Sequence, residues 1–307
     1  MKIFITGATG VLGKRVVKLL IEQNHAVAAL ARSDANISLL NSLHAEPRRG
    51  NLFDTNQMIA LAKDCQAILH LATQIPKLPA PKKDDWKMND RIRIEGTRNM
   101  VNAALANKIR IFIQQSVTFI YGSRNDFEVD AKTPVSAVQS GTLQSVIEME
   151  KIVREKLNPD YVIARFGRFY SSDSFHTRQL IDRTRKRKLT VIGKGNYYWN
   201  LIHADDAASA IVYSLNHFDR LKGNTINFTD FSPIFFREVM RILTEKTNSR
   251  KPFSLPLPVA KLLLGKAAFD YLTMSHRILK SELIADWYPH FKNFEEGITS
   301  VIDDLNK

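Results

Sequence analysis

Three glycines spaced three residues apart, Gly7, Gly10 and Gly13, follow an apolar stretch at the start of the chain. That stretch, residues 3–5, has the character of a strand that is covered on both faces of a parallel sheet. Because glycine lacks a Cβ atom, the chain can turn tightly there and a phosphate group can approach the backbone. A helix beginning near Val11 would direct its unpaired N–H groups and positive dipole end at that phosphate. The spacing predicts a phosphate-binding turn, with a ligand-free strand–helix turn as the alternative.

Apolar strands alternate with amphipathic helices up to about residue 170. Strands are expected at 26–31, just before Gly50, and at 67–72, 110–116 and 161–164, with helices at 37–43, 58–62, 86–107 and 140–156. This alternation predicts an α/β fold with a doubly wound parallel sheet and right-handed crossovers. Beyond residue 170 short strands mix with helices, and a proline-rich loop follows at 252–258.

The turn at residues 6–13 resembles that of the short-chain dehydrogenase/reductase superfamily, in its extended, epimerase/dehydratase-like and atypical branches, where it reads Thr-Gly-Ala/Gly-Thr-Gly-x-x-Gly. The resemblance implies a Rossmann-type sheet that binds NAD(P) and a smaller, mixed C-terminal substrate lobe. The expected domains are 1–170 for the dinucleotide, with some later segments returning to it, and 171–307 for the substrate. The cofactor contacts implied in the turn are Gly7, Thr9, Gly10, Val11, Leu12 and Gly13.

Three further segments resemble the extended family in the same order along the chain. Residues 50–54 are similar to its Gly-Asp-Leu-x-Asp, with Asn51 in place of the acid that contacts adenine. Residues 70–73 are similar to its His-x-Ala-Ala, where small residues let the backbone approach the cofactor ribose. Residues 202–206 are similar to its Ile-His-Val-Asp-Asp. The first two matches imply further cofactor contacts at Asn51, Leu52, Leu71, Ala72 and Thr73.

A basic residue, Arg32, stands at the end of the second expected strand. In a Rossmann unit an acidic residue at this place holds the ribose hydroxyls and selects NAD. The planar guanidinium of arginine is suited to a 2′-phosphate, which a carboxylate would repel. We therefore expect NADP as the cofactor, with Arg32 and Ser33 among its contacts. The alternative is that Arg32 lies on the surface beside an edge that still accepts NAD.

The catalytic Tyr-x-x-x-Lys of the extended reductases and epimerases is absent. In the family the tyrosine acts as acid and base, and the lysine one turn later lowers its pKa. Aligning Glu150 with the family's usual glutamate places Thr142 at the tyrosine position and Val146 at the lysine position. Valine cannot replace lysine, so the chain is interpreted as an atypical member.

Hydroxyl groups after the fifth expected strand are the remaining catalytic candidates. Residues 115–122 resemble the family's Ser-Ser-x-x-Val-Tyr-Gly, and its usual catalytic serine falls on Val117. Strand alternation puts Ser116 and Thr118 on one face, where either hydroxyl could polarise a substrate carbonyl. Tyr121 offers a phenol, although it is usually structural in the family.

Three residues are candidates for contact with the substrate. Arg93 occupies a position where relatives often carry asparagine near the active site, and a buried arginine there needs an anion or backbone carbonyls. Tyr197 and Trp199 lie in a glycine-containing loop that could cover the nicotinamide, with a core position as the equal alternative. No metal-ligand constellation is present, and no metal is predicted.

The composition narrows the class of protein. The 307 residues carry a net charge of +13 and a hydrophobic fraction of 44%, without an apolar run long enough to span a bilayer. The single cysteine excludes an internal disulfide, and Met1 leads directly into a core strand without a signal peptide, so we expect a cytoplasmic protein. The dense basic run at 183–188 lacks interleaved aromatics, which argues against specific nucleic-acid binding. It is interpreted as a solvated helix end, with an anionic substrate, partner or membrane surface as the alternative.

The leading hypothesis is that the protein is an enzyme, an NADP-binding atypical dehydrogenase/reductase that moves hydride to or from a small organic substrate. If the basic residues serve the substrate, that substrate is anionic. A hydroxyl or a water would replace the missing phenol. The first alternative is a non-catalytic sensor or interaction protein whose partner affinity depends on NADP(H). The second is an epimerase or dehydratase of nucleotide-sugars, although those reactions normally need the tyrosine. A homodimer is compatible with each hypothesis.

Overall fold

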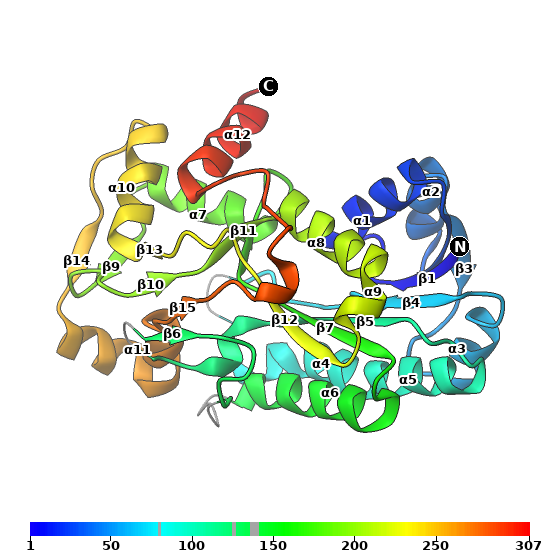
Figure 1. Ribbon diagram of the computed structural model, residues 1–307. Helices are drawn as coiled ribbons and strands as arrows, with labels where there is room; N and C mark the ends of the chain where they lie inside the picture. Colours follow the sequence, from blue (N-terminus) through cyan, green and yellow to red (C-terminus); the bar gives the residue numbers. More distant parts are fainter. Residues whose placement is uncertain (79–80, 125–126, 136–140) are drawn as a thin grey trace. The chain divides into compact units, whose positions relative to one another are not determined.

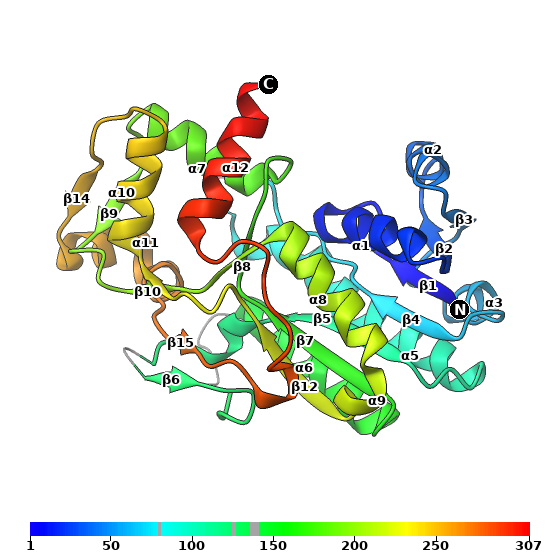
Figure 2. The same ribbon diagram turned by 45° about the horizontal axis from the view of Figure 1, so that its top comes forward.

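The computed structural model describes residues 1–78, 81–124, 127–135 and 141–307, and it contains two compact units (Figures 1 and 2). Unit 1 comprises Met1–Val117, Gly141–Arg165 and Ala207–Ile226. Unit 2 comprises Thr118–Ser140, Phe166–Asp206 and Asn227–Lys307. Each unit is therefore assembled from segments that are distant in the sequence.

A seven-stranded sheet forms the frame of unit 1, in the order β12-β7-β5-β4-β1-β2-β3. The strands are β1 (Lys2–Thr6), β2 (Ala26–Ala31), β3 (Glu46–Arg49), β4 (Ala67–His70), β5 (Phe112–Val117), β7 (Tyr161–Phe166) and β12 (Asn224–Phe228). From β1 the chain runs first to β2 and β3 on one side and then to β4 and β5 on the other, with parallel pairing throughout these strands. The doubly wound α/β fold predicted from the sequence is thus confirmed, with its switch point beside β1.

Helices cover both faces of this sheet (Figure 1). They are α1 (Val11–Glu22), α2 (Asp34–Ser42), α3 (Thr55–Leu61), α4 (Lys87–Arg91), α5 (Thr97–Ala106), α6 (Gly141–Leu157), α8 (Ala204–Asn216) and α9 (Phe218–Leu221), with the short turns η1 (Lys83–Trp86) and η2 (Ile92–Gly96). On the face that carries α3, α5 and α6, alternate strand residues pack into one buried core, including Phe4, Ile68, Phe112 and Ile163. Burial on both faces explains why these strands are apolar without alternation.

The long helix expected at 86–107 is interrupted. Helix α4 ends at Arg91, a π-helical turn occupies Ile92–Gly96, and α5 continues from Thr97. A Cβ atom at Gly96 would lie 2.8 Å from a methyl carbon of Leu52, so this turn packs closely on the segment after β3. The spacing of apolar residues in the sequence does not reveal a single wider turn. Such π turns often occur at functional positions.

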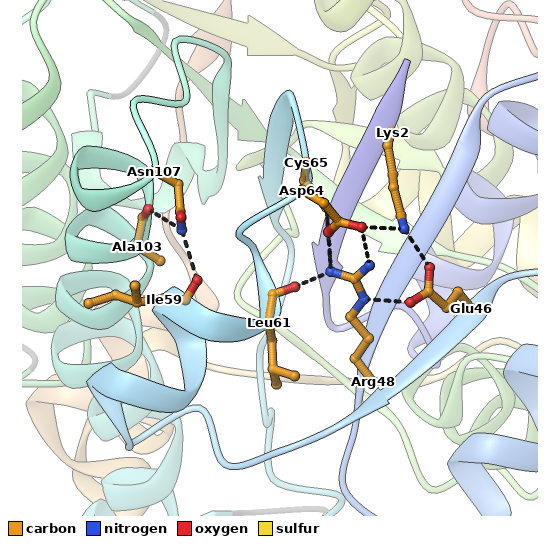
Figure 3. A network of polar contacts seen from close by, with 9 residues as sticks. All are labelled: Lys2, Glu46, Arg48, Ile59, Leu61, Asp64, Cys65, Ala103 and Asn107. Atoms are coloured by element: carbon orange, nitrogen blue, oxygen red, sulfur yellow. Dashed lines mark hydrogen bonds and ion pairs between the residues drawn. The ribbon is translucent and has the colours of Figure 1, made fainter.

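A polar network fastens the amino end of β1 to β3 and the segment after α3 (Figure 3). Arg48 donates two hydrogen bonds to Asp64, of 2.6 and 2.9 Å, and one of 2.8 Å to Glu46. Lys2 contacts the same two carboxylates at 2.6 and 2.8 Å. Hydrogen bonds from Arg48 and then Lys2 hold the pKa of Asp64 well below its ordinary value. Burial raises the pKa of the neighbouring Cys65 thiol to about 11, so this cysteine is unreactive near neutral pH.

Unit 2 consists of helices joined by four two-stranded sheets. Its elements are η3 (Thr118–Tyr121), β6 (Glu128–Val129), β8 (Arg168–Tyr170), α7 (Phe175–Arg185), β9 (Thr190–Ile192), β10 (Tyr198–Trp199), β11 (Leu201–His203), β13 (Ile234–Phe235), α10 (Phe236–Lys246), β14 (Phe253–Leu255), α11 (Leu257–Leu272), β15 (Arg277–Ile278), η4 (Glu282–Ile284) and α12 (Phe294–Asn306). A second core joins α7, α10 and α12 to these short strands through Tyr170, Ile181, Val239 and Ile298. In the described ranges of either unit, no helix combines the length and apolarity that crossing a membrane would require.

Asp230 in unit 2 carries a buried carboxylate with too few partners. One oxygen accepts the Ser232 N–H at 3.0 Å, and the other has no hydrogen-bond partner among the described residues. Burial, together with the nearby Asp206 charge, raises the pKa of Asp230 to about 7. The folded state therefore holds a proton that the unfolded chain releases near its ordinary pKa of 3.8.

Asp230→Asn is expected to raise the melting temperature, and the gain should grow as the pH rises from about 4 to about 7. Over this range the parent loses stability, because its carboxyl is already ionised in the unfolded chain but still protonated in the folded one, whereas asparagine does not titrate. Above this window the difference is expected to stay constant. Thermal unfolding of both proteins across this range measures it. An equal difference at every pH would show that Asp230 is ionised without penalty in the folded state.

Candidate functional site

The glycine turn connects β1 to α1 and leaves the amino end of that helix uncapped. Gly7 has a φ of 78°, and its carbonyl accepts the Gly10 N–H at 3.0 Å. Gly10 is the N-cap residue of α1, with φ −76° and ψ 175°, and no side chain caps the helix. No acidic residue lies in the first turn of α1. The uncapped N–H groups of this turn can therefore bind an anionic ligand.

The three glycines serve different purposes. A Cβ atom at Gly7 would lie 2.7 Å from the backbone of Ala72, and one at Gly13 would lie 2.1 Å from the Gly7 carbonyl oxygen. These two positions need glycine for the close approach of β1, α1 and the segment after β4. A Cβ atom at Gly10 would meet only the Gly7 carbonyl oxygen, at 3.3 Å. Gly10 therefore keeps space open in front of the helix, as a bound phosphate requires.

The other residues expected around the cofactor follow strands of the same sheet. The Leu71 N–H donates to the Thr6 carbonyl at 3.1 Å, which places residues 71–73 beside the end of β1. Asn51 is exposed, and its side-chain oxygen accepts the Phe53 N–H at 3.1 Å. Leu52 is buried against η2. Since parallel strands end at one edge, the structure brings these positions to the edge that carries the glycine turn.

Two arginines, Arg32 and Arg49, lie at this edge where β2 and β3 end. Ala31 is opposite Arg49 in the parallel register, and the exposed Arg32 follows Ala31 directly. Arg49 forms an ion pair with Asp34, the carboxylate that follows Arg32 most closely in the sequence. Ser33 caps α2 by accepting the Asn36 N–H at 3.3 Å. The sequence singled out Arg32 and Ser33, whereas Arg49 is identified only by the strand register.

A buried threonine–histidine pair lies where β1 and β4 end. Thr6 Oγ1 and His70 Nδ1 are 2.5 Å apart, and both side chains are fully enclosed. Burial lowers the pKa of His70 to about 4, so its imidazole is neutral near pH 7. The pair therefore joins the ends of β1 and β4 next to the glycine turn without adding a charge there.

Arg93, expected to contact substrate, lies in the π-helical turn η2 and is almost fully buried. Its Nη1 donates to Ser145 Oγ at 3.3 Å, and Ser145 donates in turn to Asp90 at 2.6 Å. The Arg93 guanidinium lies 3.9 Å from the Asp90 carboxylate. The structure therefore joins α4, η2 and α6 through these three side chains.

Val146, which is expected at the position of the family's lysine, is fully buried on α6. The Thr142 side chain lies outside the part of the chain that the structure describes. Four residues after Val146, Glu150 accepts hydrogen bonds from Arg165 at 2.6 and 2.8 Å, from Arg154 at 2.5 Å and from Ser116 at 2.6 Å. The Ser116 hydroxyl is thus already committed as a donor.

Two of the candidate hydroxyls belong to unit 2. Thr118 is fully buried, and its Oγ1 has no hydrogen-bond partner among the described residues. Tyr121 donates to the Asn227 side-chain oxygen at 2.8 Å, and its ring lies edge-on to His276 at 6.0 Å. Burial lowers the pKa of His276 to about 4. Its Nδ1 donates to the Gly122 carbonyl at 3.0 Å, so its buried Nε2 is a bare acceptor.

A guanidinium enclosed by aromatic rings in unit 2 is that of Arg168 at the start of β8, which sequence reasoning missed. Its guanidinium carbon lies 4.7 Å from the ring of Phe119, 4.5 Å from Trp199 and 5.3 Å from Tyr271. No hydrogen bond or ion pair joins this guanidinium to any residue in the described ranges. The only signal in the sequence is that this arginine directly follows a glycine, Gly167. In the structure, a Cβ atom at Gly167 would lie 2.6 Å from the Asn200 carbonyl oxygen.

The two aromatic candidates of unit 2 have different surroundings. Tyr197 is buried and stacks on Phe236 with ring centroids 5.2 Å apart, and burial raises its pKa. Trp199 is half-buried between Phe236 and Arg168, and its Nε1 is buried without a partner in the described ranges. The structure thus places Trp199, with Arg168, in a cationic aromatic cluster.

A model of the NAD-dependent epimerase/dehydratase family matches residues 3–228, which contain the glycine turn and, except for Lys2, the seven-stranded sheet. The chain belongs to this family. The match includes the segments that resemble the short-chain dehydrogenase/reductase superfamily.

Curated relatives of the family are distant in sequence and include reductases. A 3-diazoavenalumate denitrifying reductase from Streptomyces is 23% identical over an alignment of 309 positions, which covers 97% of this chain and 99% of the relative. A 4-hydroxy-2-methyl-3-oxo-4-farnesyl-3,4-dihydroquinoline-1-oxide ketoreductase from Stigmatella aurantiaca is 24% identical over an alignment of 252 positions, which covers 80% of this chain and 73% of the relative.

Solved structures with the same fold hold either nicotinamide cofactor. The human epimerase family protein SDR39U1 with NADPH superposes with a TM-score of 0.81 at 16% identity, covering 99% of this chain and 100% of that one. A dTDP-glucose 4,6-dehydratase from Bacillus anthracis in complex with NAD superposes with a TM-score of 0.78 at 16% identity, covering 99% and 96%. These likenesses confirm the fold, and the choice between NAD and NADP depends on the residues of this chain.

Proposed function

We propose that this protein is an NADP(H)-dependent oxidoreductase of the atypical branch, which moves hydride between the cofactor and a small organic substrate. The observation that carries the proposal is the uncapped amino end of α1 behind Gly10, at the edge where Arg32 and Arg49 also lie. The reductase names of the curated relatives support the same direction of chemistry. Residues 1–170 would form the dinucleotide-binding domain, with some later segments such as Ala207–Ile226 returning to it, and residues 171–307 would form the substrate lobe.

Each part of the dinucleotide has a matching group in unit 1. The backbone N–H groups after Gly10 would hold the pyrophosphate. Arg32 would hold the 2′-phosphate, and Arg49 offsets the charge of Asp34 that would otherwise oppose it. The close approach of Gly7 to Ala72 leaves backbone rather than side chain at the centre of the edge. When bound, NADP(H) supplies the hydride.

The protein groups then orient the substrate and polarise its reacting oxygen. Val146 cannot provide the ammonium group that lowers the pKa of a tyrosine, and Ser116 already donates to Glu150. Thr118 is the candidate that the contacts favour as hydrogen-bond donor to the substrate oxygen. Its buried hydroxyl has no hydrogen-bond partner among the described residues and is therefore available to donate. A single neutral donor suits an acceptor that needs little protonation, such as an activated alkene or a quinone-like carbonyl.

The substrate is proposed to carry an anionic group and an unsaturated or aromatic body. Arg168 offers a guanidinium without a carboxylate partner in the described ranges, surrounded by the rings of Phe119, Trp199 and Tyr271. A carboxylate can bind the guanidinium edge, while a planar body packs against the rings. A screen of NADPH oxidation should therefore compare each candidate acid with its methyl ester, and the acid should react with the lower KM.

Arg32→Ala is expected to weaken NADPH binding by about 10- to 100-fold, the worth of one charge-assisted hydrogen bond, while NADH binding stays unchanged. Quenching of the three tryptophans during titration with each nucleotide measures both affinities. Lys18→Ala is the matched control, since Lys18 is an exposed cation on α1 whose contact is Glu22.

The titration also separates the competing functions. Binding of neither nucleotide would contradict both the oxidoreductase and the redox-sensor hypotheses. Tight NADPH binding without turnover of any acceptor would favour the non-catalytic sensor. Selective binding of a nucleotide-sugar would favour the epimerase or dehydratase alternative.

A further inference from the structure

The first half of α11 exposes apolar side chains to an unusual degree. Leu262 and Leu263 are 85% and 70% exposed. Together with these two, the exposed apolar residues of this half-helix are Leu257, Val259 and Leu264, which we name the leucine tip. Ala260 is the buried residue that fixes this half-helix to the core of unit 2. Consecutive leucines in solvent are not explained by packing within the described chain, and such patches mark interaction surfaces.

A break in helix α11 lies directly after the leucine tip. Gly265 has a φ of 72° and a ψ of 162°, which divides α11 into two short helices. A Cβ atom at Gly265 would have no atom within 4 Å, so the break faces open space. Phe253 on β14, 65% exposed, adds an aromatic ring to the same end of unit 2, because β14 leads directly into α11.

Basic side chains lie beside the leucine tip in the sequence and just before strands β9 and β14. Lys261 and Lys266 flank the three consecutive leucines in the sequence. Strand β14 pairs with β9, which follows the dense basic run of α7, and the Arg187 guanidinium lies 5.0 Å from the Phe253 ring. We name as the basic collar the exposed residues Arg187, Lys188, Arg250, Lys251, Lys261 and Lys266. Figures 1 and 2 both show β9 beside β14, with α11 continuing from the end of β14.

The segment that carries the leucine tip contains few carboxylates. Between residues 247 and 281 the sequence contains one acidic residue, Asp270, which lies 3.0 Å from the Lys266 ammonium group. The basic collar is therefore largely uncompensated by this segment. A second copy of the chain would bring another basic collar against it, in a protein whose net charge is +13, and like charges would oppose that association.

We propose that the leucine tip and the basic collar bind the surface of an anionic lipid bilayer. The exposed leucines would enter the boundary between headgroups and acyl chains, and the lysines and arginines would contact the anionic headgroups. Burial of the leucine tip would favour insertion into the bilayer, and the basic collar would make binding selective for negatively charged lipids. This inference does not depend on the proposed catalytic function, since none of its residues belongs to the cofactor edge or the Arg168 cluster.

Vesicle co-sedimentation of the full chain tests the proposal. We expect binding to vesicles of phosphatidylcholine with about a third phosphatidylglycerol, much weaker binding to phosphatidylcholine alone, and weakening by salt. Leu262→Ser and Leu263→Ser are each expected to reduce the partition coefficient about tenfold, and Lys261→Glu at least about fivefold. Leu105→Ser is the matched control, since Leu105 is a half-exposed leucine of α5 in unit 1.

A second variant reports insertion directly. The emission of Leu263→Trp is expected to shift to shorter wavelength on adding anionic vesicles, whereas Leu105→Trp should show no shift. Equal binding to neutral and anionic vesicles, or binding unaffected by the leucine and lysine variants at unchanged melting temperature, would overturn the proposal. So would a lipid-independent dimer that Leu262→Ser and Leu263→Ser dissociate, because a second copy would then cover the tip.

Discussion

Gly10→Asp is expected to abolish measurable NADPH binding while leaving the protein folded and at least as stable as the parent. Gly10 is the N-cap of α1 and has the extended backbone that an aspartate N-cap adopts. Aspartate can thus accept the N–H groups that glycine leaves unpaired, which gains a few tenths of a kcal/mol. The same carboxylate would occupy the place of the pyrophosphate, and repulsion at that distance should lower the affinity by about 100-fold or more.

Gly10→Asn separates charge from bulk. Asparagine caps a helix as well as aspartate does but is neutral, so its loss of affinity should be distinctly smaller. Tryptophan quenching by NADPH gives the affinities, and thermal unfolding verifies the fold. Undiminished NADPH binding by Gly10→Asp would show that the phosphates do not approach α1, and the proposed cofactor site would be wrong.

Glu150→Gln is expected to cost about 3–5 kcal/mol of the free energy of unfolding, because it leaves the buried Arg165 guanidinium without its counter-charge. Glu150 and Arg165 are only 1% and 2% exposed. Burial opposes ionisation of Glu150, but the hydrogen bonds and charge of Arg165 outweigh it and hold the pKa of Glu150 below its ordinary value. Such a loss is a large part of the total stability of a typical domain.

Glu155→Gln provides the comparison on the same helix. Glu155 is 59% exposed and lies 4.0 Å from Lys151, so its replacement should change stability by less than about 0.5 kcal/mol. Chemical denaturation of both variants measures the difference. Equal costs of the two substitutions would show that the contacts of Glu150 with Arg165 do not stabilise the packing of α6 on β7.

The segment from β1 to α1 was predicted almost in full from the sequence. Its apolar strand, its glycines and the first residues of its helix are adjacent in the chain, and their conformation follows from local sterics and hydrogen bonding. The same is true of most strands and helices of unit 1. The π-helical turn at Ile92–Gly96 was not predicted, because one wider turn hardly changes the apolar pattern.

What the sequence by itself determined is the α/β frame, the glycine turn and the candidate Arg32. Only the tertiary structure decided which charges are in contact. Arg49 reaches Asp34 through the pairing of β2 with β3, Ser116 reaches Glu150 through the packing of α6 on β5, and Arg168 meets three rings from separate segments. The physical reason is that strand and helix patterns depend on near neighbours. Electrostatic and aromatic contacts depend on distances between side chains that the chain alone leaves far apart.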